Sequence, residues 1–323
     1  MTNVETAPRT ELEDVVRNVV ARHVAAPTRV APLRGGLSNH AFDVETDHEQ
    51  VVVRLADQPD KLEGYERERQ AADRARALGV PTQEVVAIGQ EGAWTYSIAR
   101  RLAGDPAMDH PDRLSILEEL GRIARAVHGI RTVGFGPRFT WDEGGIGQAS
   151  ARSSASNDAT WAEYLRHELR AHERLDRLAG LGMIEGRQEE SLRQTLAEVE
   201  AWTGPSILNH GDLRLKNVVV GAEGHILGLI DWESSVSVVG PHWDLSIALH
   251  DLSIDAKQAF LTGYGLSDEE IRQAAPTWRL FNVLNYVPRI DQLVDADDTA
   301  ELDRVRTRLS GALDLYAADR DPG

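Results

Sequence analysis

Three polar side chains stand at the ends of short apolar runs in residues 209–233. Asp212 follows a His-Gly pair, Asn217 comes five residues later, and Asp231 comes after a second apolar run. A carboxylate can orient a hydroxyl for attack, while an amide oxygen and a second carboxylate can hold Mg²⁺ against phosphate oxygens. The plain alternative is a β-hairpin in which Asp and Asn form the turns. That alternative requires all three polar positions and both apolar runs to coincide by chance. The spacing therefore favours phosphoryl transfer.

The form His210-Gly211-Asp212, Asn217 and Asp231-Trp232 resembles the catalytic loop and metal motif of kinase folds. It is most similar to the aminoglycoside phosphotransferase and choline kinase superfamily. Local stretches at residues 41–42, 53–54, 95–101, 135–137 and 145–148, and Trp161, resemble the hygromycin B phosphotransferase branch. The likeness spans roughly residues 30 to 250. It implies an α+β, bilobal, protein-kinase-like fold with a small antiparallel β-sheet lobe and a mainly helical C-terminal lobe.

The same resemblance implies roles for the three polar residues. Asp212 would be the catalytic carboxylate that aligns the acceptor hydroxyl, and Asn217 and Asp231 would bind Mg²⁺. ATP would be the phosphate donor, with the Gly-rich turn over its phosphates. That turn contributes the expected nucleotide-binding residues Gly35, Gly36, Ser38 and Asn39. A structural Gly-Gly hairpin is the alternative for this turn.

Arg54 occupies the strand position where protein kinases carry a phosphate-holding lysine. An arginine fork can bind phosphate and a carboxylate together. Glu68 is the expected carboxylate, because it stands eleven residues before Gly79-Val80-Pro81, a spacing that resembles the phosphotransferase family pattern, and Glu66 is the competitor. An exposed ion pair without function is the alternative for Arg54 and Glu68.

The elements that must position these residues follow from periodicity. Residues 11–24 and 63–78 predict helices, and strands at 85–89 and 94–99 complete a five-stranded sheet with the hairpin. Residues 100–104 read as a hinge, where backbone groups near Ala99 and Arg101 would hold the adenine edge. We therefore predict a nucleotide-binding lobe over 1–99, a hinge over 100–104 and a helical lobe over 105–323. In that lobe we expect helices near 114–128, 161–178 and 192–202, with His128 packed in the core.

The composition limits the possible partners. The chain has 323 residues, 41% of them hydrophobic, so a sizeable core is expected, and without cysteine it has no disulfide or thiolate metal site. A formal net charge of −17 argues against nucleic acid as a partner. No apolar run approaches the ~18 residues of a membrane helix, and residues 1–10 lack a signal core. We therefore expect a cytoplasmic protein that binds neither nucleic acid nor membrane.

The acceptor is expected to be a small molecule. Only twelve residues separate Asp231 from Asp244, which leaves no room for the peptide-docking segment of a protein kinase. Asp244 either braces the catalytic loop, as the resemblance implies, or simply caps a helix. Glu233 and Asp291 are the preferred acids for a cationic acceptor such as an aminoglycoside. Two alternatives stay open: a kinase of a sugar, amino alcohol or macrolide, and a nucleotide-binding protein without catalysis.

Overall fold

The computed structural model describes residues 9–33, 40–142, 160–250 and 252–313. The chain divides into two compact units. Unit 1 comprises Met1–Met108 and Lys216–Glu233, and unit 2 comprises Asp109–Leu215 and Ser234–Gly323. Residues 216–233 thus pack with the sheet-containing unit, although they lie beyond residue 105 in the chain. The boundaries 1–99, 100–104 and 105–323 stay a prediction.

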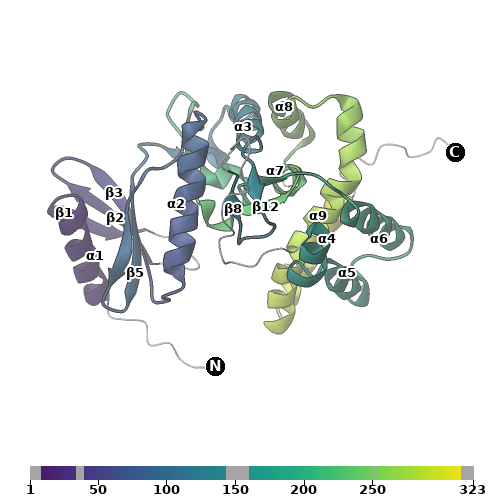
Figure 1. Cartoon of the computed structure of the whole chain (residues 1–323), viewed down its shortest axis with the longest axis horizontal. Coiled ribbons are helices and arrows are strands. Elements are labelled where there is room, and N and C mark those ends of the chain that lie inside the picture. The colour runs from purple at the N-terminus through teal and green to yellow at the C-terminus, as the bar shows by residue number, and fades with distance from the viewer. Residues whose placement is uncertain (1–8, 34–39, 143–159, 251, 314–323) are drawn as a thin grey trace. The chain divides into compact units, whose positions relative to one another are not determined.

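Unit 1 is built on the antiparallel five-stranded sheet that the sequence predicted, in the order β1-β2-β3-β5-β4. Two helices accompany it, and the sheet lies between them (Figure 1). The bounds are α1 (Arg9–His23), β1 (Pro27–Pro32), β2 (His40–Thr46), β3 (Gln50–Ala56), α2 (Lys61–Ala77), β4 (Val85–Glu91) and β5 (Trp94–Arg100).

The two faces of this sheet differ because side chains alternate along each strand. Val51, Val53 and Leu55 of β3 are fully buried and pack with the apolar stripe of α1. Arg54 therefore points to the opposite face, where it meets Glu68 of α2. Alternation along one strand thus separates the core face from the polar face.

Two of the predicted site residues, Asn217 and Asp231, lie just outside the strands of a second, three-stranded sheet of unit 1. Its order is β11-β10-β6, with β6 (Asp105–Pro106), β10 (Val218–Val220) and β11 (Ile226–Leu229). Val219 and Val220 pair with β6, which ties residues 216–233 to unit 1. Gly104 allows this approach, since a Cβ there would lie 2.2 Å from the Val220 carbonyl oxygen.

Unit 2 is mainly helical. One apolar core of this unit gathers residues from α4, the π-helical turn η2, α5, α6, α9 and α10, together with β12. The helices are α3 (Arg113–Val127), α4 (Trp161–Glu163), η2 (Tyr164–Glu168), α5 (Ala171–Gly180), α6 (Arg187–Glu200), α7 (His242–Ala248), α8 (Ile254–Tyr264), α9 (Asp268–Asp295) and α10 (Thr299–Leu313). The short strands of unit 2 are β7 (Thr132–Val133), β8 (Thr140–Trp141), β9 (Ser206–Asn209) and β12 (Val236–Val239). Three 3₁₀ turns of the described residues lie where the chain passes from one unit to the other: η1 (Ala107–Asp109), η3 (Leu215–Asn217) and η4 (Trp232–Ser234).

The single helix predicted over 161–178 is wrong. The chain forms α4, passes through the wider turn η2 and then breaks at Arg170, whose φ is +54°. Wide turns of this kind interrupt the regular hydrogen-bond ladder of an α-helix, and a left-handed residue ends it. The apolar residues on both sides of the break still enter one core, which is why their spacing suggested a continuous helix.

Glycines let α3 and α8 pack closely. A Cβ on Gly121 would lie 2.2 Å from the Phe260 carbonyl oxygen, and one on Gly263 would lie 1.8 Å from that of Glu118. This close packing fixes the C-terminal end of α3, which leads to His128, beside the end of α8 at Tyr264.

Candidate functional site

The β10–β11 hairpin of unit 1 brings Asn217 and Asp231 to one end. Val218 pairs with Leu229, and the Ile230 N–H donates to the Asn217 carbonyl at 2.9 Å. Asn217 directly precedes β10 and Asp231 follows Ile230, so both side chains start from the same end of the hairpin. Asp231 has φ of +66°, a left-handed turn that Asp tolerates better than most residues. The structure therefore places the two predicted metal ligands next to each other.

These two residues fit Mg²⁺ only in combination with a phosphate ligand. Mg²⁺ is commonly bound through one or two protein oxygens plus substrate phosphates. Within the described residues no group of three His, Asp or Glu side chains could hold a metal without other ligands. One carboxylate and one amide, with Asn217 almost fully buried, match the kind of site that is completed by a nucleotide.

Arg54 and Glu68 form an ion pair on the polar face of the main sheet. The Arg54 Nη2 lies 2.5 Å from Glu68 Oε2, and both side chains are largely buried. Glu68, and not Glu66, is thus the partner of Arg54. The guanidinium also lies 4.9 Å from the ring centre of Tyr65. The pair holds Arg54 in a fixed position.

Burial and the neighbouring negative charge shift the pKa of Arg54 in opposite directions. Burial alone would lower the pKa of Arg54, but the charge and hydrogen bond of Glu68 outweigh it and raise the pKa above its ordinary value. Burial raises the pKa of Tyr65 to about 12. Glu233 lies 4.0 Å from the Lys61 ammonium, so its carboxylate has a counter-ion within unit 1. The Arg54 guanidinium therefore stays positively charged beside the Glu68 carboxylate.

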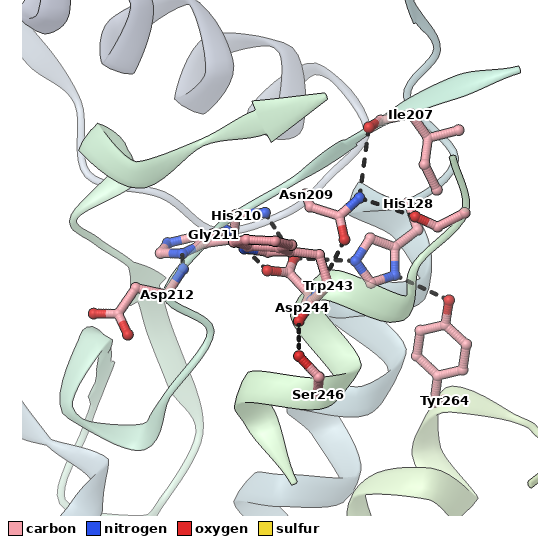
Figure 2. Close-up of polar contacts among 11 residues, drawn as sticks. His128, Ile207, Asn209, His210, Gly211, Asp212, Trp243, Asp244, Ser246 and Tyr264 are labelled. Atoms are coloured by element: carbon pink, nitrogen blue, oxygen red, sulfur yellow. Dashed lines mark hydrogen bonds and ion pairs between the residues drawn. The ribbon is translucent and has the colours of Figure 1, made fainter. Parts of the chain in front are cut away.

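Unit 2 contains the loop that carries Asp212. Asp244, the third residue of α7, accepts hydrogen bonds from the backbone N–H groups of His210 at 2.6 Å and Gly211 at 2.8 Å. The Asp212 carboxylate is directed away from this network (Figure 2). Since the helix cap position of α7 is Pro241, Asp244 does not cap the helix. It braces the loop that carries Asp212.

A second layer of residues, which the sequence did not assign to the site, holds Asp244. His128 Nε2 lies 3.1 Å from Asp244 Oδ2, and His128 Nδ1 lies 2.9 Å from the Tyr264 hydroxyl (Figure 2). A carboxylate only accepts, so His128 donates from Nε2 to Asp244. Asn209 Oδ1 accepts the Asp244 N–H at 3.1 Å. His128 is buried as expected, but through Asp244 it also supports the loop that carries Asp212.

Gly211 is required by the loop's conformation. Its φ is +86°, and a Cβ there would lie 1.8 Å from the Ser234 carbonyl oxygen. Only glycine combines this φ with so close an approach at no steric cost.

Asp212 and Arg214 form an ion pair within the same loop. Arg214 Nε lies 3.0 Å from Asp212 Oδ1, and the arginine side chain is 43% exposed against 20% for the aspartate. Leu213 between them is buried, which anchors the loop. This pair was not predicted from the sequence.

The other predicted site residues lie in several places. Ala99 is buried in β5, where it pairs with β3 and β4. The Arg101 N–H donates to the Gln50 carbonyl, and its side chain lies 3.2 Å from Asp43. Asp291 is exposed on α9, where it pairs with Arg177 at 2.8 Å. The turn residues Gly35, Gly36, Ser38 and Asn39, and the segment 145–148, lie outside the described residues.

A family model described as "Phosphotransferase enzyme family" matches residues 29–281. This match spans most of the chain and includes every motif discussed above. The chain belongs to the phosphotransferase enzyme family. It is a small-molecule phosphotransferase, and the predicted kinase-like fold is confirmed. No curated protein sequence matches the chain.

Two solved structures illustrate the shared fold. One is a thermostable mutant of aminoglycoside phosphotransferase APH(4)-Ia in a ternary complex with ADP and hygromycin B, with 19% identity and a TM-score of 0.66 over 94% of this chain and 99% of that one. The other is the macrolide 2'-phosphotransferase MphH from Brachybacterium faecium, with 18% identity and a TM-score of 0.59 over 95% and 99%. At such identities the likeness shows the fold.

No helix within the described residues is both long and apolar enough to span a bilayer.

Proposed function

We propose that this phosphotransferase moves the γ-phosphate of ATP to a hydroxyl group of a small molecule. The observation that carries the proposal is the hairpin that sets Asn217 beside Asp231, together with the separately braced loop that presents Asp212. Two related structures contain ADP or AMP-PNP, which supports ATP as the donor. A cytoplasmic location, where ATP is available, belongs to the same proposal.

Each residue has a distinct task in this mechanism. Arg54, held by Glu68, binds phosphate oxygens of the nucleotide. Asn217 and Asp231 bind Mg²⁺, which when bound neutralises charge on the β- and γ-phosphates. Asp212 accepts a hydrogen bond from the acceptor hydroxyl and aligns it for in-line attack. Because the transition state of phosphoryl transfer is loose, positioning and charge stabilisation supply most of the acceleration.

The first acceptor we propose is an aminoglycoside such as hygromycin B. The sequence resemblance supports it, and the APH(4)-Ia structure contains that compound. A sugar, amino alcohol or macrolide is the second candidate. Within this set a neutral sugar is favoured over a cationic amino alcohol, because the acids expected to attract a cation have counter-ions: Asp291 pairs with Arg177 and Glu233 lies near Lys61.

A coupled assay of ADP release tests the proposal. The panel comprises hygromycin B, erythromycin, glucose, glucosamine, N-acetylglucosamine and choline, with Asp212→Asn as the control. We expect saturable, Mg²⁺-dependent turnover with at least one acceptor, and loss of several powers of ten in kcat in the variant. Turnover with a neutral acceptor and none with hygromycin B would reject the aminoglycoside assignment and keep the transferase.

A further inference from the structure

Arg214 brings a positive charge to the place where the acceptor hydroxyl must lie. Its Nε is 3.0 Å from Asp212 Oδ1, the carboxylate that we propose receives that hydroxyl. Two residues span at most about 7 Å of extended chain, and buried Leu213 anchors the backbone between them. The Arg214 guanidinium therefore stays close to the reacting hydroxyl.

A cation fixed there affects an incoming acceptor in a specific way. An ammonium group on the acceptor beside the reacting hydroxyl would approach the guanidinium as well as the carboxylate. The carboxylate already has a counter-ion, so the ammonium gains little attraction and meets a like charge. A neutral neighbour, such as another hydroxyl or an amide, meets no such repulsion and can accept a hydrogen bond from the guanidinium.

The other two acids that were expected to attract a cation, Asp291 and Glu233, also lie beside a basic residue of their own unit. Asp291 of unit 2 has Arg177 at 2.8 Å, and Glu233 of unit 1 has Lys61 at 4.0 Å. Although the formal net charge is −17, these carboxylates are locally balanced. The pairing of Asp212 with Arg214 thus fits a local pattern of balanced acids.

We propose that Arg214 is a specificity-determining residue, which selects acceptors with no ammonium group next to the hydroxyl that is phosphorylated. This inference rests on the proposed phosphotransferase function and narrows its acceptor class. A cationic antibiotic remains an acceptor when its ammonium groups lie away from the reacting hydroxyl. An amino sugar with adjacent ammonium and hydroxyl groups is a poor one.

The test compares acceptors that differ only in the ammonium group. Glucosamine with N-acetylglucosamine, and hygromycin B with its N-acetylated form, are assayed with wild type, Arg214→Gln and Arg214→Lys. We expect the wild type to show the higher kcat/KM for the acetylated member of at least one pair. Arg214→Gln should lower that preference by about fivefold, while Arg214→Lys retains it. Arg122→Gln is the matched control, because it removes an exposed arginine paired with Glu118 on α3.

Two results contradict different claims. If wild type transfers phosphate to some acceptor but Arg214→Gln leaves the preference unchanged, the role of Arg214 is rejected and the phosphotransferase function stands. If the folded wild type transfers phosphate to no member of the panel in the presence of Mg²⁺ and ATP, the proposed function fails and this inference fails with it.

Discussion

Replacing Asp244 by asparagine should damage both the stability of unit 2 and catalysis. Asp244 accepts from the His210 N–H at 2.6 Å and from the Gly211 N–H at 2.8 Å, and His128 donates to the same oxygen as His210. An asparagine offers one oxygen and one NH₂ group. The NH₂ must therefore face either the Gly211 N–H or both the His210 N–H and His128 Nε2. At least one charge-assisted hydrogen bond is lost and one buried N–H is left without an acceptor.

The magnitude follows from these contacts. A hydrogen bond to a charged group contributes about 1.5–3 kcal/mol, and breaking a buried ionic network costs about 3–5 kcal/mol. We expect Asp244→Asn to lower the free energy of unfolding by about 3 kcal/mol. Because the loop that presents Asp212 loses its brace, kcat should fall by about a hundredfold.

Urea unfolding and steady-state kinetics measure the two effects. Asp255→Asn is the matched control, since Asp255 is exposed in the first turn of α8 and makes the same chemical change. The reasoning is refuted if Asp244→Asn keeps both the unfolding midpoint and the kcat of the wild type.

Three further predictions concern other parts of the molecule. Gly211→Ala should yield little folded or active protein, because its Cβ would lie 1.8 Å from the Ser234 carbonyl oxygen, and a wild-type melting curve would contradict this. Glu68→Gln should raise the KM for ATP by about tenfold or more, because Arg54 loses its charged partner. An unchanged KM would show that the Arg54–Glu68 pair does not contribute to nucleotide binding. Burial lowers the pKa of His242 to about 4, against about 6.5 when unfolded, so the unfolded state binds more protons between these values. The free energy of unfolding should therefore fall as pH drops from 6.5 to 4, by about 3 kcal/mol, and His242→Gln should lose this part of the pH dependence in urea titrations.

Local spacing predicted the parts of the site that lie close in sequence. Asn217 and Asp231 are joined by one hairpin, so the apolar runs between them were enough to place both at one end. Arg54 and Glu68 are separated by one strand end and one helix, and counting from residue 79 selected the right glutamate. Such pairs could be predicted because their members are close in sequence and lie in motifs with a fixed spacing.

The residues that support the loop carrying Asp212 could not be found in this way. His128 lies 116 residues from Asp244 and 136 from Tyr264, and it stands on the same helical stripe as ordinary core residues. No local signal distinguishes a packed histidine from one that fixes a loop. The break at Arg170 was missed for a related reason, because core packing maintains the apolar pattern across a left-handed residue.

The most direct test of the account follows labelled γ-phosphate from ATP to the best acceptor, in wild type, Asp212→Asn and Asp231→Asn side by side. We expect label in the acceptor with wild type and loss of several powers of ten in both variants, with weaker binding of Mg²⁺ and ATP only in Asp231→Asn. Near-normal transfer by either variant, or label released solely as inorganic phosphate by the wild type, would contradict it.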